Sequence, residues 1–95
     1  MMPAHVKIYT REACGYCTAA LRLLDKKGVQ FEHIDCTGDP KTRRWLAEVT
    51  GQSTVPQIFI NGRSVGGYTD IRALDLRGEL DRLLAEAPQA SSSSG

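Results

Sequence analysis

The feature that most constrains this chain is a pair of cysteines at the point where the hydrophobic period changes. Before the pair, Val6 and Ile8 alternate with polar residues, a period of two that predicts a strand over residues 5–10. After it, the apolar positions follow a helical period and form one stripe, made of Cys17, Ala20, Leu21 and Leu24. Two lysines and Gly28 are typical of the end of such a helix. The fold therefore opens with a strand that leads through Cys-x-x-Cys into a helix.

The rest of the chain continues with short strands and helices. Alternation predicts a second strand over 31–34, and Asp39-Pro40 predicts the start of a helix that ends near Gly51. We expect that helix to bury one apolar side, made of Trp45, Leu46 and Val49. A third strand over 55–60, the turn Asn61-Gly62 and a short fourth strand at Ser64-Val65 predict a hairpin. A last helical region follows Gly66-Gly67, and Gly78 divides it in two.

This order of elements, β-α-β-α-β-β-α, predicts an α/β fold. The βαβ opening implies a right-handed crossover between parallel strands, and the hairpin adds an antiparallel pair. We therefore expect a mixed four-stranded sheet with helices on both faces. The 95 residues accommodate one domain, over residues 1–87, and the Ser-rich residues 88–95 are expected to form a disordered tail.

Composition excludes several classes of protein. The net charge is +1, without the clustered basic residues that a nucleic-acid-binding surface requires. No apolar run approaches the roughly 20 residues of a bilayer-spanning helix, and the first residues lack the apolar stretch of a signal peptide. We therefore expect a cytoplasmic protein that binds neither nucleic acid nor membrane.

The positions of the two cysteines differ in a way that suits redox chemistry. Cys14 falls at the helix start, where free backbone amides and the helix dipole favour a thiolate. Cys17 lies on the apolar stripe and is expected to be sheltered as a thiol. An exposed thiolate that attacks a disulfide, with a second thiol that resolves the mixed disulfide, is the arrangement that dithiol–disulfide exchange needs. In a βαβ unit, this spacing is typical of a thioredoxin-like redox motif.

Two other interpretations of the cysteines are open. The pair can be a packing feature, since free cysteines are often buried. Cys14 and Cys17, followed by His33-x-x-Cys36, also match the spacing of a zinc site with three cysteines and one histidine. Against zinc, residues three apart on a strand point to opposite faces. We expect His33 to be a half-exposed strand residue and Cys36 a spare thiol near a strand end.

Two further segments can contribute to a binding site. Thr54-Val55-Pro56 places an X-Pro bond at the entry of a strand. Pro56 is either a cis residue that leaves the Val55 backbone free to pair with a peptide, or an ordinary start of an edge strand. In Gly66-Gly67-Tyr68-Thr69-Asp70, the glycines allow close backbone approach. Thr69 and Asp70 either hold the charged end of a ligand or cap the helix.

Taken together, the motifs closely resemble those of the glutaredoxins. The residues that carry the likeness are Cys14-Gly15-Tyr16-Cys17, Thr54-Val55-Pro56 and Gly66-Gly67-x-x-Asp70, with Tyr9-Thr10 before them and Ala73-Leu74-Asp75-x-Arg77-Gly78 after them. The likeness runs from about Val6 to Leu84 and is strongest to the short bacterial dithiol members. It implies a thioredoxin fold and a glutathione-dependent disulfide oxidoreductase.

The resemblance also implies roles for individual residues. Cys14 corresponds to the nucleophile and Cys17 to the resolving thiol. The glutathione site it implies is made of Arg11, Tyr16, Arg43, Thr54, Val55, Pro56, Gly67, Thr69 and Asp70. Within that site, Thr54 and Val55 pair with the cysteinyl backbone, while Thr69 and Asp70 hold the γ-glutamyl end. Arg11 and Arg43 are cations that face an anionic tripeptide.

One departure from the family pattern opens an alternative. Gly15 stands where the commonest active site has proline, and relatives with glycine or serine there can bind a [2Fe–2S] cluster between two subunits. In that case Cys14 is the cluster ligand and the protein is a dimer; otherwise we expect a monomer and no metal. The co-substrate is glutathione, and no nucleotide binds directly. The partners are glutathionylated or disulfide-bonded proteins and, indirectly, glutathione reductase with NADPH.

Overall fold

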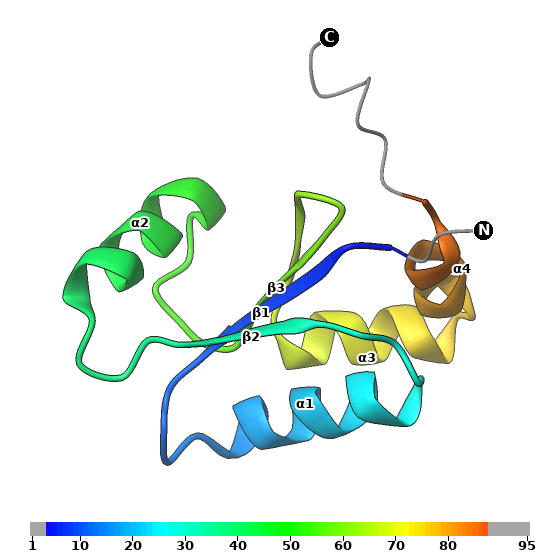
Figure 1. Ribbon diagram of the computed structural model, residues 1–95, viewed down its shortest axis with the longest axis horizontal. Helices are drawn as coiled ribbons and strands as arrows, with labels where there is room; N and C mark the ends of the chain where they lie inside the picture. Colours follow the sequence, from blue (N-terminus) through cyan, green and yellow to red (C-terminus); the bar gives the residue numbers. More distant parts are fainter. Residues whose placement is uncertain (1–3, 88–95) are drawn as a thin grey trace, which may run out of the picture.

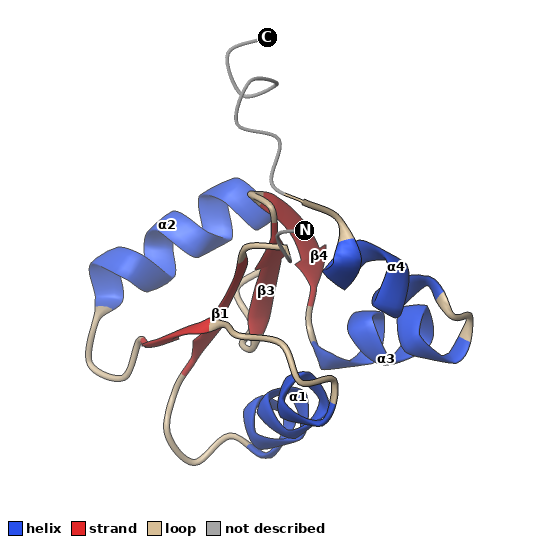
Figure 2. Ribbon diagram, turned by 45° about the vertical axis from the view of Figure 1, so that its right-hand side comes forward, coloured by secondary structure: helices blue, strands red, loops and turns tan. Residues whose placement is uncertain are grey.

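The computed structural model describes residues 4–87. Its centre is a four-stranded sheet in the order β2-β1-β3-β4 (Figures 1 and 2). The strands are β1 (Val6–Thr10), β2 (Glu32–Asp35), β3 (Gln57–Ile60) and β4 (Arg63–Gly66). β1 pairs in parallel with β2 and antiparallel with β3, and β3 pairs antiparallel with β4. The predicted mixed sheet is confirmed.

Local signals place the helices. They are α1 (Gly15–Lys26), α2 (Pro40–Thr50), α3 (Tyr68–Leu76) and α4 (Glu79–Ala85). Asp39 caps α2, because its Oδ1 accepts from Thr42 N at 3.2 Å, and Gly51 ends that helix with a φ of +74°. Gly78, with a φ of +75°, separates α3 from α4, as the sequence predicts.

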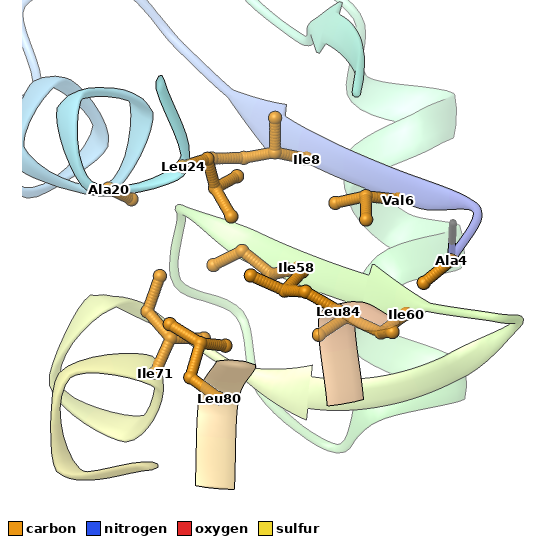
Figure 3. Packing of buried hydrophobic residues seen from close by; sticks show 10 residues of the cluster. All are labelled: Ala4, Val6, Ile8, Ala20, Leu24, Ile58, Ile60, Ile71, Leu80 and Leu84. Carbon is orange, nitrogen blue, oxygen red and sulfur yellow. The ribbon is translucent and has the colours of Figure 1, made fainter. Parts of the chain in front are cut away.

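The main core lies between the sheet and three helices. Figure 1 shows α2 on one side of the sheet and α1 and α3 on the other. Because strand residues alternate between faces, every second residue of β1 and β3 points toward α1, α3 and α4. The buried cluster there consists of Ala4, Val6, Ile8, Ala20, Leu24, Ile58, Ile60, Ile71, Leu80 and Leu84 (Figure 3). Ala20 and Leu24 pack α1 against β1 and β3 in this cluster.

The opposite face has a smaller core, and here one prediction is wrong. Leu46 of α2 is buried together with Tyr9 of β1 and with Cys36. Trp45 and Val49, which the sequence suggested were buried, are 44% and 49% exposed. The reason is that α2 is the one described helix on this face, so the outer sides of these residues have no cover. Trp45 instead stacks on Phe59, with ring centroids 6.1 Å apart.

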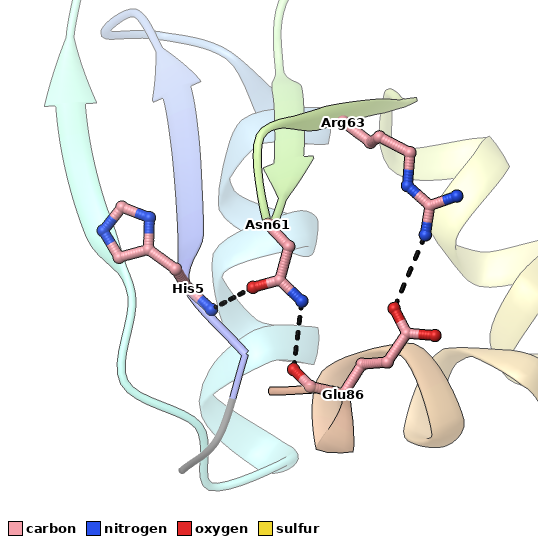
Figure 4. A network of polar contacts seen from close by, with 4 residues as sticks. All are labelled: His5, Asn61, Arg63 and Glu86. Carbon is pink, nitrogen blue, oxygen red and sulfur yellow. Dashed lines mark hydrogen bonds and ion pairs between the residues drawn. The ribbon is translucent and has the colours of Figure 1, made fainter. Parts of the chain in front are cut away.

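The hairpin turn joins both ends of the described chain. Asn61 and Gly62 have φ values of +53° and +81°, as a two-residue turn with two left-handed residues requires. The Asn61 side chain accepts from His5 N at 2.8 Å and donates to Glu86 O at 3.0 Å (Figure 4). Arg63 adds an ion pair with Glu86 at 3.5 Å. The hairpin is thereby tied to the N-terminal strand and to the end of α4.

Two expectations concern the chain as a whole. Within residues 4–87, no helix combines the length and apolar character needed to cross a bilayer. The predicted tail at 88–95 lies outside the described residues, and so does the start of the predicted domain at 1–3.

Candidate active site

Cys14 is the N-cap residue of α1, where the sequence predicted it. Its Sγ accepts a hydrogen bond from the Cys17 backbone N–H at 3.2 Å, and its side chain is half-buried. A thiolate in this place receives an otherwise unpaired amide of the first helical turn and the positive end of the helix dipole. Its partial exposure leaves the sulfur open to a disulfide.

Cys17 has the opposite environment. It is only 2% exposed and belongs to the buried side of α1. Burial raises the pKa of the Cys17 thiol to about 11, and the hydrogen bond with the Cys14 side chain adds to the increase. A backbone hydrogen bond from Arg11 acts in the other direction but does not offset the burial. Cys17 is therefore protonated at neutral pH, and the two cysteines differ in exposure as the sequence predicts.

A groove of about 310 Å³ is lined by residues from three separate segments. It is lined by Tyr16, Gln52, Thr54, Val55, Pro56, Gly67, Tyr68, Thr69 and Asp70. Seven of these are predicted site residues, which the fold brings together from α1, the segment before β3 and the start of α3. Sequence reasoning missed Gln52 and Tyr68. The sequence does indicate Tyr68, because it lies between the predicted site residues Gly67 and Thr69, but nothing in the sequence indicates Gln52.

Val55 and Pro56 connect the dithiol to this groove. The Cys14 Sγ lies 3.8 Å from the Val55 carbonyl oxygen, within reach of a thiol donor. The Val55–Pro56 bond is cis, as the first of the two interpretations of Pro56 requires. β3 begins only at Gln57, so Val55 precedes the sheet ladder.

The glycine pair permits the close contacts expected of it. A Cβ on Gly67 would lie 3.1 Å from the Pro56 carbonyl oxygen, and one on Gly66 would overlap the Asp70 carboxylate. That carboxylate accepts from the Gly67 backbone N–H at 2.9 Å, which is half of a capping box. Asp70 is therefore a capping residue of α3, and its carboxylate also forms part of the groove wall.

The wall of the groove near the dithiol is aromatic. The rings of Tyr16 and Tyr68 stack with centroids 6.1 Å apart and planes 24° apart. Tyr16 is 64% exposed and lines the groove, so its ring is accessible to a ligand.

The two predicted arginines lie outside the set of groove-lining residues. Arg11 is exposed after β1, and both its backbone and its charge act on Cys17. Arg43 is exposed on α2; burial raises the pKa of Cys36, and the Arg43 charge opposes part of that increase. Arg11 thus acts electrostatically on the dithiol, whereas Arg43 acts on Cys36.

The four residues of the zinc interpretation are not gathered. Cys36 is fully buried, and its Sγ lies 3.9 Å from Ile34 O. His33 is exposed, more so than predicted, and its Nε2 lies 2.7 Å from Thr10 Oγ1. Over residues 4–87, no three His, Cys, Asp or Glu side chains are arranged to hold a metal ion. The spacing therefore does not correspond to a metal site in the described residues, because His33 is exposed on β2 whereas Cys36, just after the strand, is fully buried.

A thioredoxin-like α/β fold with a dithiol at the start of its first helix defines a thiol oxidoreductase. The sequence model of the family described as Glutaredoxin matches residues 6–65. Glutaredoxin 3 of Escherichia coli K12 is 47% identical over 81 residues, which cover 85% of this chain and 98% of that protein. The chain belongs to the glutaredoxin family.

Solved structures agree with this assignment. The solution structure of a glutaredoxin from Brucella melitensis is 44% identical with a TM-score of 0.79, over 87% of this chain and 90% of that one. A crystal structure of a buckwheat glutaredoxin–glutathione complex is 27% identical with a TM-score of 0.79, over 85% and 76%.

Proposed function

We propose that this protein is a glutathione-dependent oxidoreductase that reduces glutathione mixed disulfides and protein disulfides through Cys14 and Cys17. The observation that carries the proposal is the half-buried Cys14 sulfur, 3.8 Å from the backbone of a segment that lines a groove of about 310 Å³. A groove of this size suits a tripeptide. The buckwheat glutaredoxin, whose structure is a complex with glutathione, supports the same ligand.

The first step is a disulfide exchange at Cys14. The Cys14 thiolate attacks the glutathionyl sulfur of a mixed disulfide, and a Cys14–glutathione disulfide forms as the substrate's S–S bond breaks. The substrate sulfur leaves as a thiolate and takes a proton from solvent. The substrate has gained two electrons, and Cys14 now carries the oxidised sulfur.

Two routes complete the cycle. In one, a second glutathione thiolate attacks the bound glutathionyl sulfur, which releases glutathione disulfide and restores the Cys14 thiolate. In the other, Cys17 loses its proton and attacks the Cys14 sulfur, so that glutathione leaves and a Cys14–Cys17 disulfide forms. Burial raises the pKa of Cys17 to about 11 in the reduced protein, so the second route requires Cys17 to lose its proton as it attacks. Two glutathione molecules reduce the intramolecular disulfide, and glutathione reductase with NADPH regenerates them.

The groove residues have separate roles in this proposal. The Val55 backbone pairs with the cysteinyl unit of glutathione as an added strand, with Thr54 and Pro56 on either side. Thr69 and Asp70 hold the γ-glutamyl end at the start of α3, where the helix dipole attracts its carboxylate. Gly67 and Tyr16 shape the wall. Arg11 and Arg43 contribute positive charge from outside the groove.

The test is turnover of a glutathionylated peptide, coupled to NADPH through glutathione reductase. Cys14→Ser is expected to abolish turnover, and Cys17→Ser to retain deglutathionylation while losing reduction of many protein disulfides. Cys36→Ser is the matched control, because it removes the remaining cysteine, which is buried away from the groove. Unchanged turnover in Cys14→Ser would refute the mechanism.

The [2Fe–2S] alternative was inferred from Gly15. A Cβ at that position would meet no atom within 4 Å, so the open space beside Cys14 does not depend on glycine. The geometry of residues 4–87 therefore adds no specific support for a cluster, and this function stays a prediction. Anaerobic reconstitution with iron, sulfide and glutathione tests it, with a coloured dimer as the expected product.

A further inference from the structure

Gln57 is a buried polar residue for which the proposed chemistry has no use. It is the first residue of β3, pairs with Tyr9 of β1, and is fully buried. Its side chain lies on the α2 face of the sheet, two residues before Phe59 on the same face. A glutamine amide in such a place needs hydrogen bonds to offset its loss of water.

All hydrogen bonds of the Gln57 side chain go to one loop. Its Nε2 donates to Gln52 Oε1 and to Thr54 O, both at 3.0 Å, and lies 3.5 Å from Thr54 Oγ1. Because a backbone carbonyl can only accept, the contact with Thr54 O determines the orientation of the amide. The Gln57 Oε1 has no hydrogen-bond partner within residues 4–87. The amide therefore serves as a donor to this loop.

The loop at residues 52–54 is an exposed part of the groove wall. Gln52, Ser53 and Thr54 are exposed, and Gln52 and Thr54 line the groove. On the other side of Val55, the Gly67 backbone approaches the Pro56 carbonyl. The wall segment is thus held at two points, by the Gln57 amide from inside and by the start of α3 from across the groove.

We propose that Gln57 is a positioning residue, whose amide orders residues 52–54 so that Thr54 and Val55 are in place before glutathione binds. This inference rests on the proposed function. A segment that becomes ordered only on binding loses affinity, because its conformational entropy is then lost during association. Preorganisation by Gln57 acts on binding, while the dithiol acts on the chemical step.

The test uses Gln57→Met, which keeps the length of the side chain and removes its polar atoms. The variant deletes the donor and the unpaired Oε1 together, and the exposed loop can bond to water, so a small change in melting temperature is expected. The KM for a glutathionylated peptide is expected to rise about fivefold at nearly unchanged kcat. Order parameters from ¹⁵N relaxation are expected to fall at Ser53 and Val55.

Two further variants separate positioning from general destabilisation. Phe59→Leu changes the same strand and face away from the loop, and is expected to lower the melting temperature without raising KM. Gln57→Glu places a carboxylate against the Thr54 carbonyl, which can only accept, and is expected to raise KM more than Gln57→Met does. Wild-type KM and order parameters in Gln57→Met, or an equal rise in KM in Phe59→Leu, would overturn the inference.

The relaxation measurement also keeps this inference distinct from the proposed function. Absence of glutathione turnover in the wild-type protein would refute the proposed function. In that event, lower order parameters at Ser53 and Val55 in Gln57→Met would still support the anchoring of the loop, and unchanged values would overturn it.

Discussion

Substitution of Gly66 by alanine is expected to cause a large loss of stability for two separate reasons. Gly66 has a φ of +96°, in the left-handed region, where a residue with a Cβ costs about 1–2 kcal/mol more than glycine. The Cβ itself would lie 2.6 Å from the Asp70 Cγ, too close for any real contact. The carboxylate must therefore turn away, which breaks the 2.9 Å hydrogen bond from Gly67 N to Asp70 Oδ2.

The size of the effect follows from these two losses. A lost capping bond costs about 0.5–2 kcal/mol, so Gly66→Ala is expected to lower the free energy of unfolding by about 1.5–4 kcal/mol. For a domain of this length, that corresponds to a melting temperature lower by about 6–32 °C. Thermal and urea denaturation followed by circular dichroism measure it. Because Asp70 also lines the groove, the KM for a glutathionylated peptide is expected to rise as well.

A double-mutant cycle distinguishes the two causes. Asp70→Ala removes the carboxylate that the new Cβ would meet, so Gly66→Ala in that background retains only the cost of its backbone conformation. The double variant is expected to be more stable than the sum of the single effects predicts. A Gly66→Ala melting temperature within about 3 °C of wild type, or strict additivity in the cycle, would refute the reasoning.

Three further predictions concern other parts of the fold. Gly15→Ala is expected to leave stability unchanged or raise it by up to about 1 kcal/mol in urea denaturation, because its Cβ meets nothing within 4 Å and alanine favours a helix; a clear loss would contradict this. Leu46→Ala is expected to cost about 2–5 kcal/mol and Val49→Ala under about 1 kcal/mol, since Leu46 is buried and Val49 half exposed; equal losses in urea denaturation would contradict the packing of α2. Folding raises the pKa of Cys17 from 9.0 to about 11, so the folded protein binds one more proton than the unfolded protein between these pH values. The contribution of Cys17 to stability is therefore fully present below pH 9 and is lost as the pH rises through 11. Thermal denaturation is expected to show a steeper alkaline loss in wild type than in Cys17→Ser, and parallel profiles would contradict the shift.

Much of the fold was predictable because its signals are local. The Asp39 cap, the left-handed glycines at 51 and 78, and the Asn61-Gly62 turn each depend on residues within one turn of the chain. The positions of Cys14 and Cys17 on α1 follow in the same way from the helical period. The burial of Trp45 and Val49 was wrongly predicted, because periodicity identifies the apolar side of a helix but not how much of that side a neighbour covers.

The amino-acid sequence by itself therefore determined the order of the elements and the unequal environments of the two cysteines, since both depend on short-range backbone preferences. Only the tertiary structure decided how the groove is built. It brings Val55 to Cys14 across 41 positions of sequence, and it brings the Gly67 backbone to the Pro56 carbonyl. These contacts join segments whose distance along the chain carries no information about their distance in space. Packing of the helices on the sheet sets that distance, and with it the place where a ligand can meet the Cys14 sulfur.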